Sequence, residues 1–176
     1  MASAIQALRE ELKTDDKWKR FRAVVKAAYD PQFDGYIEEM RLLHKTRNIR
    51  LMNAQSSLSA KRLADANMND QSTRSRCAEI CMEIATSRNH LAIMMDTLND
   101  HLIGKYGSLL SKHGVRAMTE KTRVLGSLFG PAQQTLDRLD TITEIADTII
   151  KDIDQAGYTL NRLGNLFEVI TARERG

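Results

Sequence analysis

The chain has 176 residues, of which 28% are charged and 42% hydrophobic, and its net charge is +3. This length suits one domain, or one domain with a projecting helix, and so small a net charge does not by itself indicate a nucleic-acid-binding protein. With 2 prolines, 9 glycines, 5% aromatic residues and no run of alternating apolar residues, the sequence predicts an all-α helical bundle.

The N-terminal sequence, the length of the apolar runs and the cysteines indicate in which compartment the protein works. The N-terminal sequence is charged within its first ten residues. We therefore expect no secretory signal peptide, and a location in the cytoplasm or within a macromolecular assembly. The longest apolar run, Leu91–Met95, is too short to cross a membrane. Cys77 and Cys81 lie four residues apart on one predicted helix, which would strain a disulfide bond, so we expect reduced thiols.

Residues 2–29 predict a pair of amphipathic helices. The first has Ile5, Leu8 and Leu12 on one face. Thr14, Asp15 and Asp16 then offer side-chain oxygens that can cap the start of the second helix. The apolar face of the second helix comprises Trp18, Phe21, Val25 and Ala28.

The next segment predicts a long antiparallel hairpin. We expect one helix over residues 36–67 and another over residues 73–103, because both carry apolar residues at helical spacing. Residues 67–72 are polar and turn-like, and we expect them to join the two helices. His44 and Arg47 interrupt the apolar stripe of the first helix, which indicates a polar layer in the hairpin.

Several glycines follow the predicted hairpin of residues 36–103. Gly104 and Gly107 are expected to end the second hairpin helix, because Gly is a poor helix former. Residues 104–130 therefore predict a flexible connector with a shorter helix over residues 115–129.

The last segment, residues 131–176, predicts a long amphipathic helix that begins near Gly130-Pro131. From Leu139 onward every third or fourth residue is apolar, which is a heptad pattern typical of a coiled coil. We expect this helix either to pack on a bundle body formed by residues 1–130 or to project from it. The heptad residues predicted to form the core or an oligomer interface are Leu139, Ile142, Ile149, Ile153, Leu160, Leu163, Phe167 and Ile170.

No motif in the sequence indicates catalysis. There is no Glu-x-x-His or His-Glu-x-x-His pattern, and Cys77 and Cys81 have no second pair of ligands that would complete a zinc site. The sequence also lacks the Gly-x-Ser-x-Gly nucleophile motif and the phosphate-binding loop of nucleotide hydrolases. We therefore expect no enzymatic activity, no metal and no cofactor.

Basic and aromatic residues mix at the start of the second helix. Cations beside aromatic rings suit phosphate contact with base stacking. At helical spacing, however, Trp18 and Phe21 can face the core and leave the cations in solvent, so both interpretations stay open. A second basic cluster (Lys112, Arg116, Lys121 and Arg123) would favour binding if it met the first in space. The residues predicted to contact an anion or nucleic acid are Lys17, Lys19, Arg20, Arg22 and Lys26.

The surplus of apolar stripe favours a structural or assembly protein that works through helix–helix packing, as an oligomer or as a subunit of a larger complex. Its partners would be other protein chains, including further copies of itself. The alternative is a basic helical protein that binds nucleic acid. A second alternative is a helical bundle that acts on membranes through residues 1–29.

Overall fold

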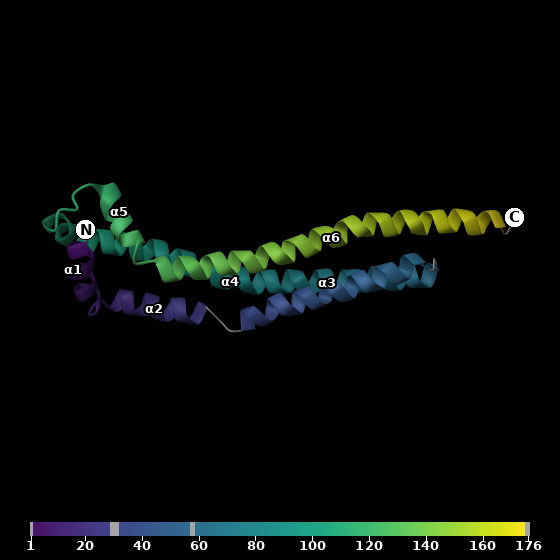
Figure 1. The fold of residues 1–176 in the computed structure, drawn as a ribbon, viewed down its shortest axis with the longest axis horizontal. Coiled ribbons are helices and arrows are strands. Elements are labelled where there is room, and N and C mark those ends of the chain that lie inside the picture. The colour runs from purple at the N-terminus through teal and green to yellow at the C-terminus, as the bar shows by residue number, and fades with distance from the viewer. Residues whose placement is uncertain (1, 29–31, 57–58, 175–176) are drawn as a thin grey trace. The chain divides into compact units, whose positions relative to one another are not determined.

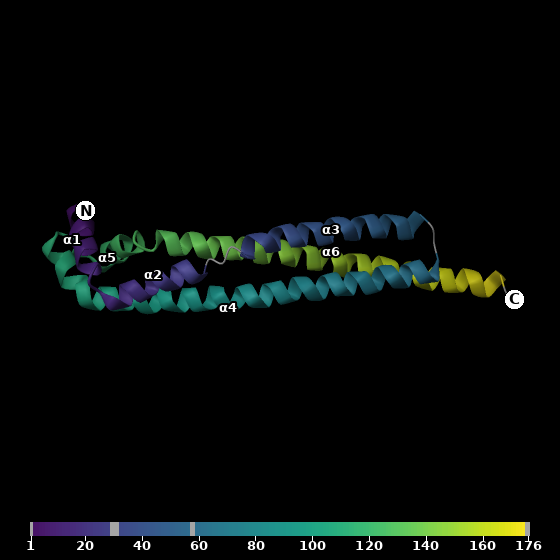
Figure 2. The ribbon, with the colours of Figure 1, turned by 90° about the horizontal axis from the view of Figure 1, so that it is seen from below.

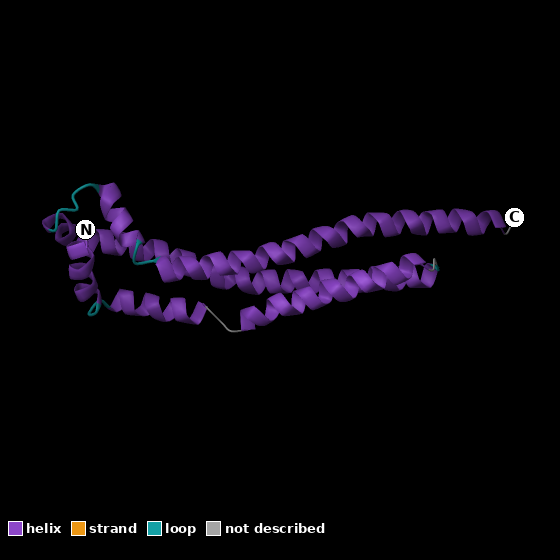
Figure 3. Cartoon of the chain, in the orientation of Figure 1, coloured by secondary structure: helices purple, strands orange, loops and turns teal. Residues whose placement is uncertain are grey.

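A computed structural model describes the backbone of residues 2–28, 32–56 and 59–174, without the side chains of residues 2–3, 49–56, 60, 167 and 174. Throughout this described part the regular elements are helices and no strand occurs, so the all-α prediction is confirmed (Figure 3). In chain order the helices are α1 (Ala2–Leu12), α2 (Asp16–Ala28), α3 (Gln32–Ser56), α4 (Ala60–Lys112), α5 (Met118–Gly126) and α6 (Gly130–Glu174) (Figure 1).

The chain packs as two compact units. The first unit comprises Met1–Asp30 with Ala85–Asp140, and the second comprises Pro31–Ile84 with Thr141–Gly176. The long helices α4 and α6 each contribute to both units. The expected body of residues 1–130, with a last helix that packs on it or projects from it, places the boundaries elsewhere. Apolar side chains are buried along both halves of α4 and of α6.

The first unit buries the apolar faces predicted for the N-terminal helices. Leu8 and Leu12 of α1 and Phe21 of α2 join one hydrophobic cluster with residues of α4, α5 and α6, including Leu102 and Leu125. Five side chains of this size each contribute roughly 1.5–3 kcal/mol when fully buried. The short helices of this unit therefore depend on tertiary packing, because isolated helices of this length are marginal in water.

The second unit contains the predicted antiparallel hairpin. Helix α3 lies alongside the first part of α4 and runs in the opposite direction (Figures 1 and 2). The stretch of α6 from Thr141 to Leu160 packs on this pair, with Asp152 bonded to Arg47 of α3 and Leu160 clustered with Leu63 of α4. Met40, Ile80 and Ile84 are almost fully buried on the hairpin helices, as are Ile142 and Ile149 on α6.

The hairpin turn was expected over residues 67–72, but the helix continues through them. Helix α3 ends at Ser56 and α4 begins at Ala60. Ser59 caps α4, since its hydroxyl oxygen accepts a hydrogen bond from the Arg62 amide at 3.2 Å. Within the predicted turn the polar side chains have partners that suit a helix: Asn69 donates to the Asp65 carbonyl one turn earlier, and Asp70 is buried as an ion-pair partner. Polar composition alone therefore placed the turn incorrectly.

Helix α4 also continues through Gly104 and Gly107 and ends at Lys112, two residues before Gly114. The Val115 amide donates to the Leu110 carbonyl at 3.0 Å and the Gly114 amide to Ser111 at 3.1 Å, which is the Schellman arrangement. Gly114 has φ of 85°, a left-handed conformation that Gly adopts without strain. The expected connector over residues 104–130 is thus mostly helical, because the buried neighbours Leu102, Tyr106 and Leu110 offset the poor helix propensity of glycine.

Substitutions of Gly104, inside α4, and of Gly114, just after its end, should change the free energy of unfolding in opposite directions. Gly114→Ala should lower the free energy of unfolding by about 1–2 kcal/mol, because an L side chain is strained in the left-handed region. Gly104→Ala should raise it by about 0.5–1 kcal/mol, because Ala favours the helix and a Cβ at this position meets no atom within 4 Å. Urea unfolding monitored by circular dichroism measures both. Changes of the same sign would contradict the helix end just before Gly114.

Candidate functional site

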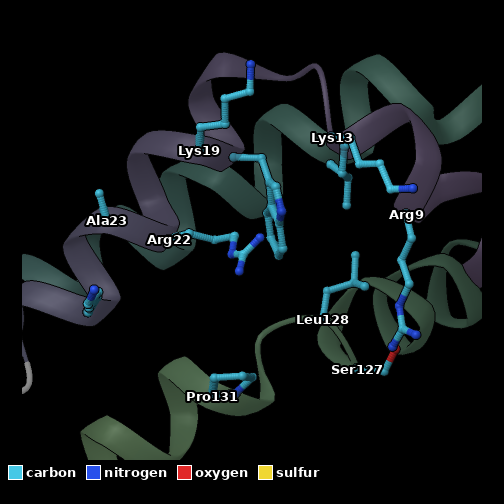
Figure 4. Close-up of a pocket in the computed structure, with 11 residues that line it drawn as sticks. Arg9, Lys13, Lys19, Arg22, Ala23, Ser127, Leu128 and Pro131 are labelled. Atoms are coloured by element: carbon cyan, nitrogen blue, oxygen red, sulfur yellow. The ribbon is translucent and has the colours of Figure 1, made fainter.

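The first unit carries an open groove of about 770 Å³ between α1, α2 and the turn that joins α5 to α6 (Figure 4). Of the described residues that line it, none is acidic and five are basic. Arg9 lies on α1 and Lys13 directly follows the last residue of that helix, whereas α2 contributes three cations at helical spacing. The basic residues are Arg9, Lys13, Lys19, Arg22 and Lys26.

Three of these five cations have no acidic partner among the described residues. Lys13 pairs with Glu10 at 2.6 Å and Lys19 with Asp16 at 3.4 Å, each pair on its own helix and exposed. Exposed pairs of this kind contribute little and exchange readily with other anions. Arg9, Arg22 and Lys26 make no ion pair within the described part of the chain. The groove therefore presents an uncompensated positive surface.

The floor of the groove is apolar and rests on an aromatic cluster. Trp18, Leu128 and Pro131 line it, and Trp18 is half-buried. The Trp18 ring lies 5.8 Å from Phe21 and 6.2 Å from Phe129, measured between centroids. These rings fix α2 against the turn before α6, and the part of the Trp18 ring that they leave uncovered lies at the groove. A smaller hollow of about 220 Å³ shares Trp18, Leu128 and Pro131 and extends the apolar floor.

Asp15 positions this groove. It is one of the three residues that the sequence offered as a cap of α2, and its Oδ1 accepts a hydrogen bond from the Trp18 amide at 3.0 Å. Its Oδ2 accepts hydrogen bonds from three side chains of α4: Lys105 at 2.7 Å, Tyr106 at 2.9 Å and the Nε2 of His101 at 3.2 Å. A single buried carboxylate thus ties the turn between α1 and α2 to α4.

The same contacts hold Asp15 in its charged form. Burial of the carboxyl group acts to raise its pKa, because it disfavours the charge. The hydrogen bonds from Lys105, from the Trp18 amide, from His101 and from Tyr106 outweigh burial and hold the pKa of Asp15 well below its usual value. The carboxylate is therefore an ionised anchor of the fold at all ordinary pH values.

The predicted basic residues divide into two groups. Lys19, Arg22 and Lys26 line the groove, whereas Lys17 and Arg20 are exposed and lie outside its lining. In Figure 4 the Arg22 side chain extends into the groove and the Lys19 side chain extends away from it. The second predicted cluster (Lys112, Arg116, Lys121 and Arg123) does not line the groove either. Sequence reasoning did not identify Arg9 and Lys13, which line the groove. Their four-residue spacing at the end of the first predicted helix was the available signal.

The predicted heptad seam is buried over most of its length and emerges at the end of α6. Ile149, Ile153 and Leu160 are buried, and Leu160 clusters with Leu63 and Ala66 of α4. Leu163 is half-buried, while the exposed fractions are 58% at Leu166 and 53% at Ile170. The side chain of Phe167 lies outside the described part. Within the second unit the end of α6 extends past the turn between α3 and α4 in both views (Figures 1 and 2).

Two further features bear on chemistry. Within the described ranges no group of three or more His, Cys, Asp or Glu side chains is arranged to hold a metal ion. Cys77 and Cys81 are free thiols, as predicted, and burial raises the pKa of both. Higher thiol pKa values reduce the reactive thiolate form, so both cysteines behave as packing residues.

The described helices include none that is both long and apolar enough to span a bilayer. Comparison with models of known protein families, with curated proteins and with solved structures finds no match for this chain.

Proposed function

We propose that the protein is a non-enzymatic assembly protein that associates with further copies of itself through the end of α6. The interface would comprise Leu163, Leu166, Val169 and Ile170. These residues follow one another at steps of three, three and one, so they occupy one continuous face of the helix. The two copies would use the same face, as is usual for symmetric dimers.

The observation that carries this proposal is an exposed apolar face that follows the buried one along α6. Ile170 has the same heptad position as Ile142, and Leu166 and Val169 lie to one side of that seam. From Leu139 to Leu160 the heptad residues are covered within the chain, but three large apolar side chains of the next turns have exposed fractions between 51% and 58%. Apolar side chains gathered at one place on a surface mark interaction sites more often than isolated ones do. A second helix with the same heptad spacing is the simplest partner that would cover them.

Introducing negative charges on this apolar face should dissociate the oligomer. We expect the wild-type protein to show a molar mass above that of its 19.9 kDa chain in light scattering, rising with protein concentration. Leu166→Glu with Ile170→Glu should return the mass to that of a single chain, because a charge buried at an interface without a partner is strongly unfavourable. The helix content should be retained, since both positions are exposed within the chain.

The matched control replaces the same residue types elsewhere. Leu42 on α3 and Ile93 on α4 have exposed fractions of 66% and 64%. Leu42→Glu with Ile93→Glu should leave the molar mass of the oligomer unchanged. A wild-type protein that stays a single chain at every concentration, or equal dissociation by both double variants, would refute self-association through α6.

A further inference from the structure

We propose that the groove of the first unit binds a segment of single-stranded nucleic acid. The cations of α1 and α2 would contact the phosphates, and Trp18 would stack on a base. This site lies in a different unit from the end of α6 and does not depend on self-association.

The arrangement of the cations matches a charged, chain-like ligand. Lys19, Arg22 and Lys26 follow one another at steps of three and four, so they rise about 4.5 and 6 Å along one face of α2. Arg9 on α1 and Lys13, the residue that follows the end of that helix, supply the second group of cations. Cations on two walls, with no acidic residue between them, can contact successive phosphates of one strand.

The net charge of the first unit also favours an anionic ligand. Its two segments carry 14 Lys and Arg residues against 10 Asp and Glu residues, a net charge of +4. The chain as a whole has a net charge of +3, so the second unit does not add to it. An anionic polymer would therefore be attracted to the unit that holds the groove.

The apolar floor distinguishes among anionic ligands. Grooves that bind single strands combine cations for the backbone with aromatic rings for the bases, and each stacked base contributes substantially to affinity. Trp18 supplies such a ring between the cations, and Arg9 and Arg22 supply planar guanidinium groups that also stack on aromatic rings. A flat bilayer surface would reach only the rim of a recessed groove, and an acidic peptide has no aromatic base to place on Trp18.

Binding can be tested by fluorescence anisotropy of a labelled thymidine oligonucleotide of about 16 nucleotides, the upper end of the range for one groove of this kind. With the full chain, we expect the logarithm of the affinity to fall with the logarithm of salt with a slope between about −2 and −3.5, for three to five neutralised phosphates. Measurements between about 50 and 200 mM salt cover the range over which such binding changes most.

A charge-matched pair of variants separates the groove from general electrostatics. Arg22→Gln with Lys26→Gln removes one Arg and one Lys from the groove lining. We expect about a tenfold or greater loss of affinity and a salt slope smaller by about 1.4. Lys17→Gln with Arg20→Gln removes the same charges from the same helix outside the lining, and should change the affinity by less than about twofold. All four side chains are exposed, so both variants should retain the wild-type circular dichroism spectrum.

Stacking can be read directly, because Trp18 is the only tryptophan of the chain. Its fluorescence should be quenched on addition of the oligonucleotide, and polyglutamate of equal charge should bind more weakly and leave the fluorescence unchanged. Four results would each overturn the proposal: no binding at low salt, equal losses in the two double variants, tighter binding of polyglutamate, or preferential binding of vesicles that contain an anionic phospholipid.

Discussion

Arg47→Met should destabilise the second unit by about 3–5 kcal/mol, the cost of leaving one member of a buried ion pair without its partner. Arg47 is 4% exposed and its Nε donates to Asp70 Oδ1 at 3.1 Å. Its Nη2 also donates to the Asp152 carbonyl oxygen at 3.2 Å, so one guanidinium joins α3, α4 and α6. The second Asp70 oxygen has no hydrogen-bond partner among the described residues, and loss of Arg47 would leave the buried carboxylate wholly unpaired.

The double variant Arg47→Met/Asp70→Leu should recover most of this loss. Both charges are then absent, and apolar side chains of similar size fill the same space. The comparison is made by urea unfolding monitored by circular dichroism, with the shift of the midpoint as the readout. Arg41→Met is the control on the same helix, because its pair with Glu38 is exposed and should contribute less than about 1 kcal/mol. An Arg47→Met variant no less stable than Arg41→Met would contradict the role of this polar layer.

Asp15→Ala should destabilise the first unit by about 2–4 kcal/mol. Loss of the cap of α2 costs about 1 kcal/mol, and the buried Tyr106 hydroxyl group, left without its acceptor, costs about 1–3 kcal/mol more. Asp16→Ala is the neighbouring control, because Asp16 is exposed and has only a 3.4 Å pair with Lys19. Thermal unfolding of both variants measures the difference, and similar losses at the two positions would disprove the special role of Asp15.

The contribution of Asp15 should also depend on pH in one direction. The folded protein holds the pKa of this carboxyl group below its ordinary value of 3.8. The charged form is therefore favoured by folding, and its stabilisation is complete above pH 3.8 and is lost as pH falls below that value. The stability difference between wild type and Asp15→Ala should accordingly be constant near neutral pH and shrink in acid. A difference that stays the same at pH 7 and pH 2.5 would argue against a charged anchor.

Local patterns predicted the helices well because they depend on near neighbours in the chain. The three- and four-residue steps from Leu139 to Leu160 define a face that is buried in the structure, and the cap of α2 is Asp15, one of the three candidates that the sequence offered. The helix ends were less predictable. Asp70 within the expected turn is compatible with a helix only because Arg47, which lies 23 residues earlier, neutralises it in the interior.

The sequence by itself determined the all-α class, the heptad face of α6 and the cations of α2, because helical periodicity fixes which side chains share a face. Only the tertiary structure decided where that face ends and which cations form a groove. Asp15 meets Lys105 and Tyr106 across separations of 90 and 91 residues, and Arg9 and Lys13 line the same groove as Ser127 and Leu128, more than a hundred residues later. Contacts at such separations follow from packing of the whole unit, and no local pattern encodes them.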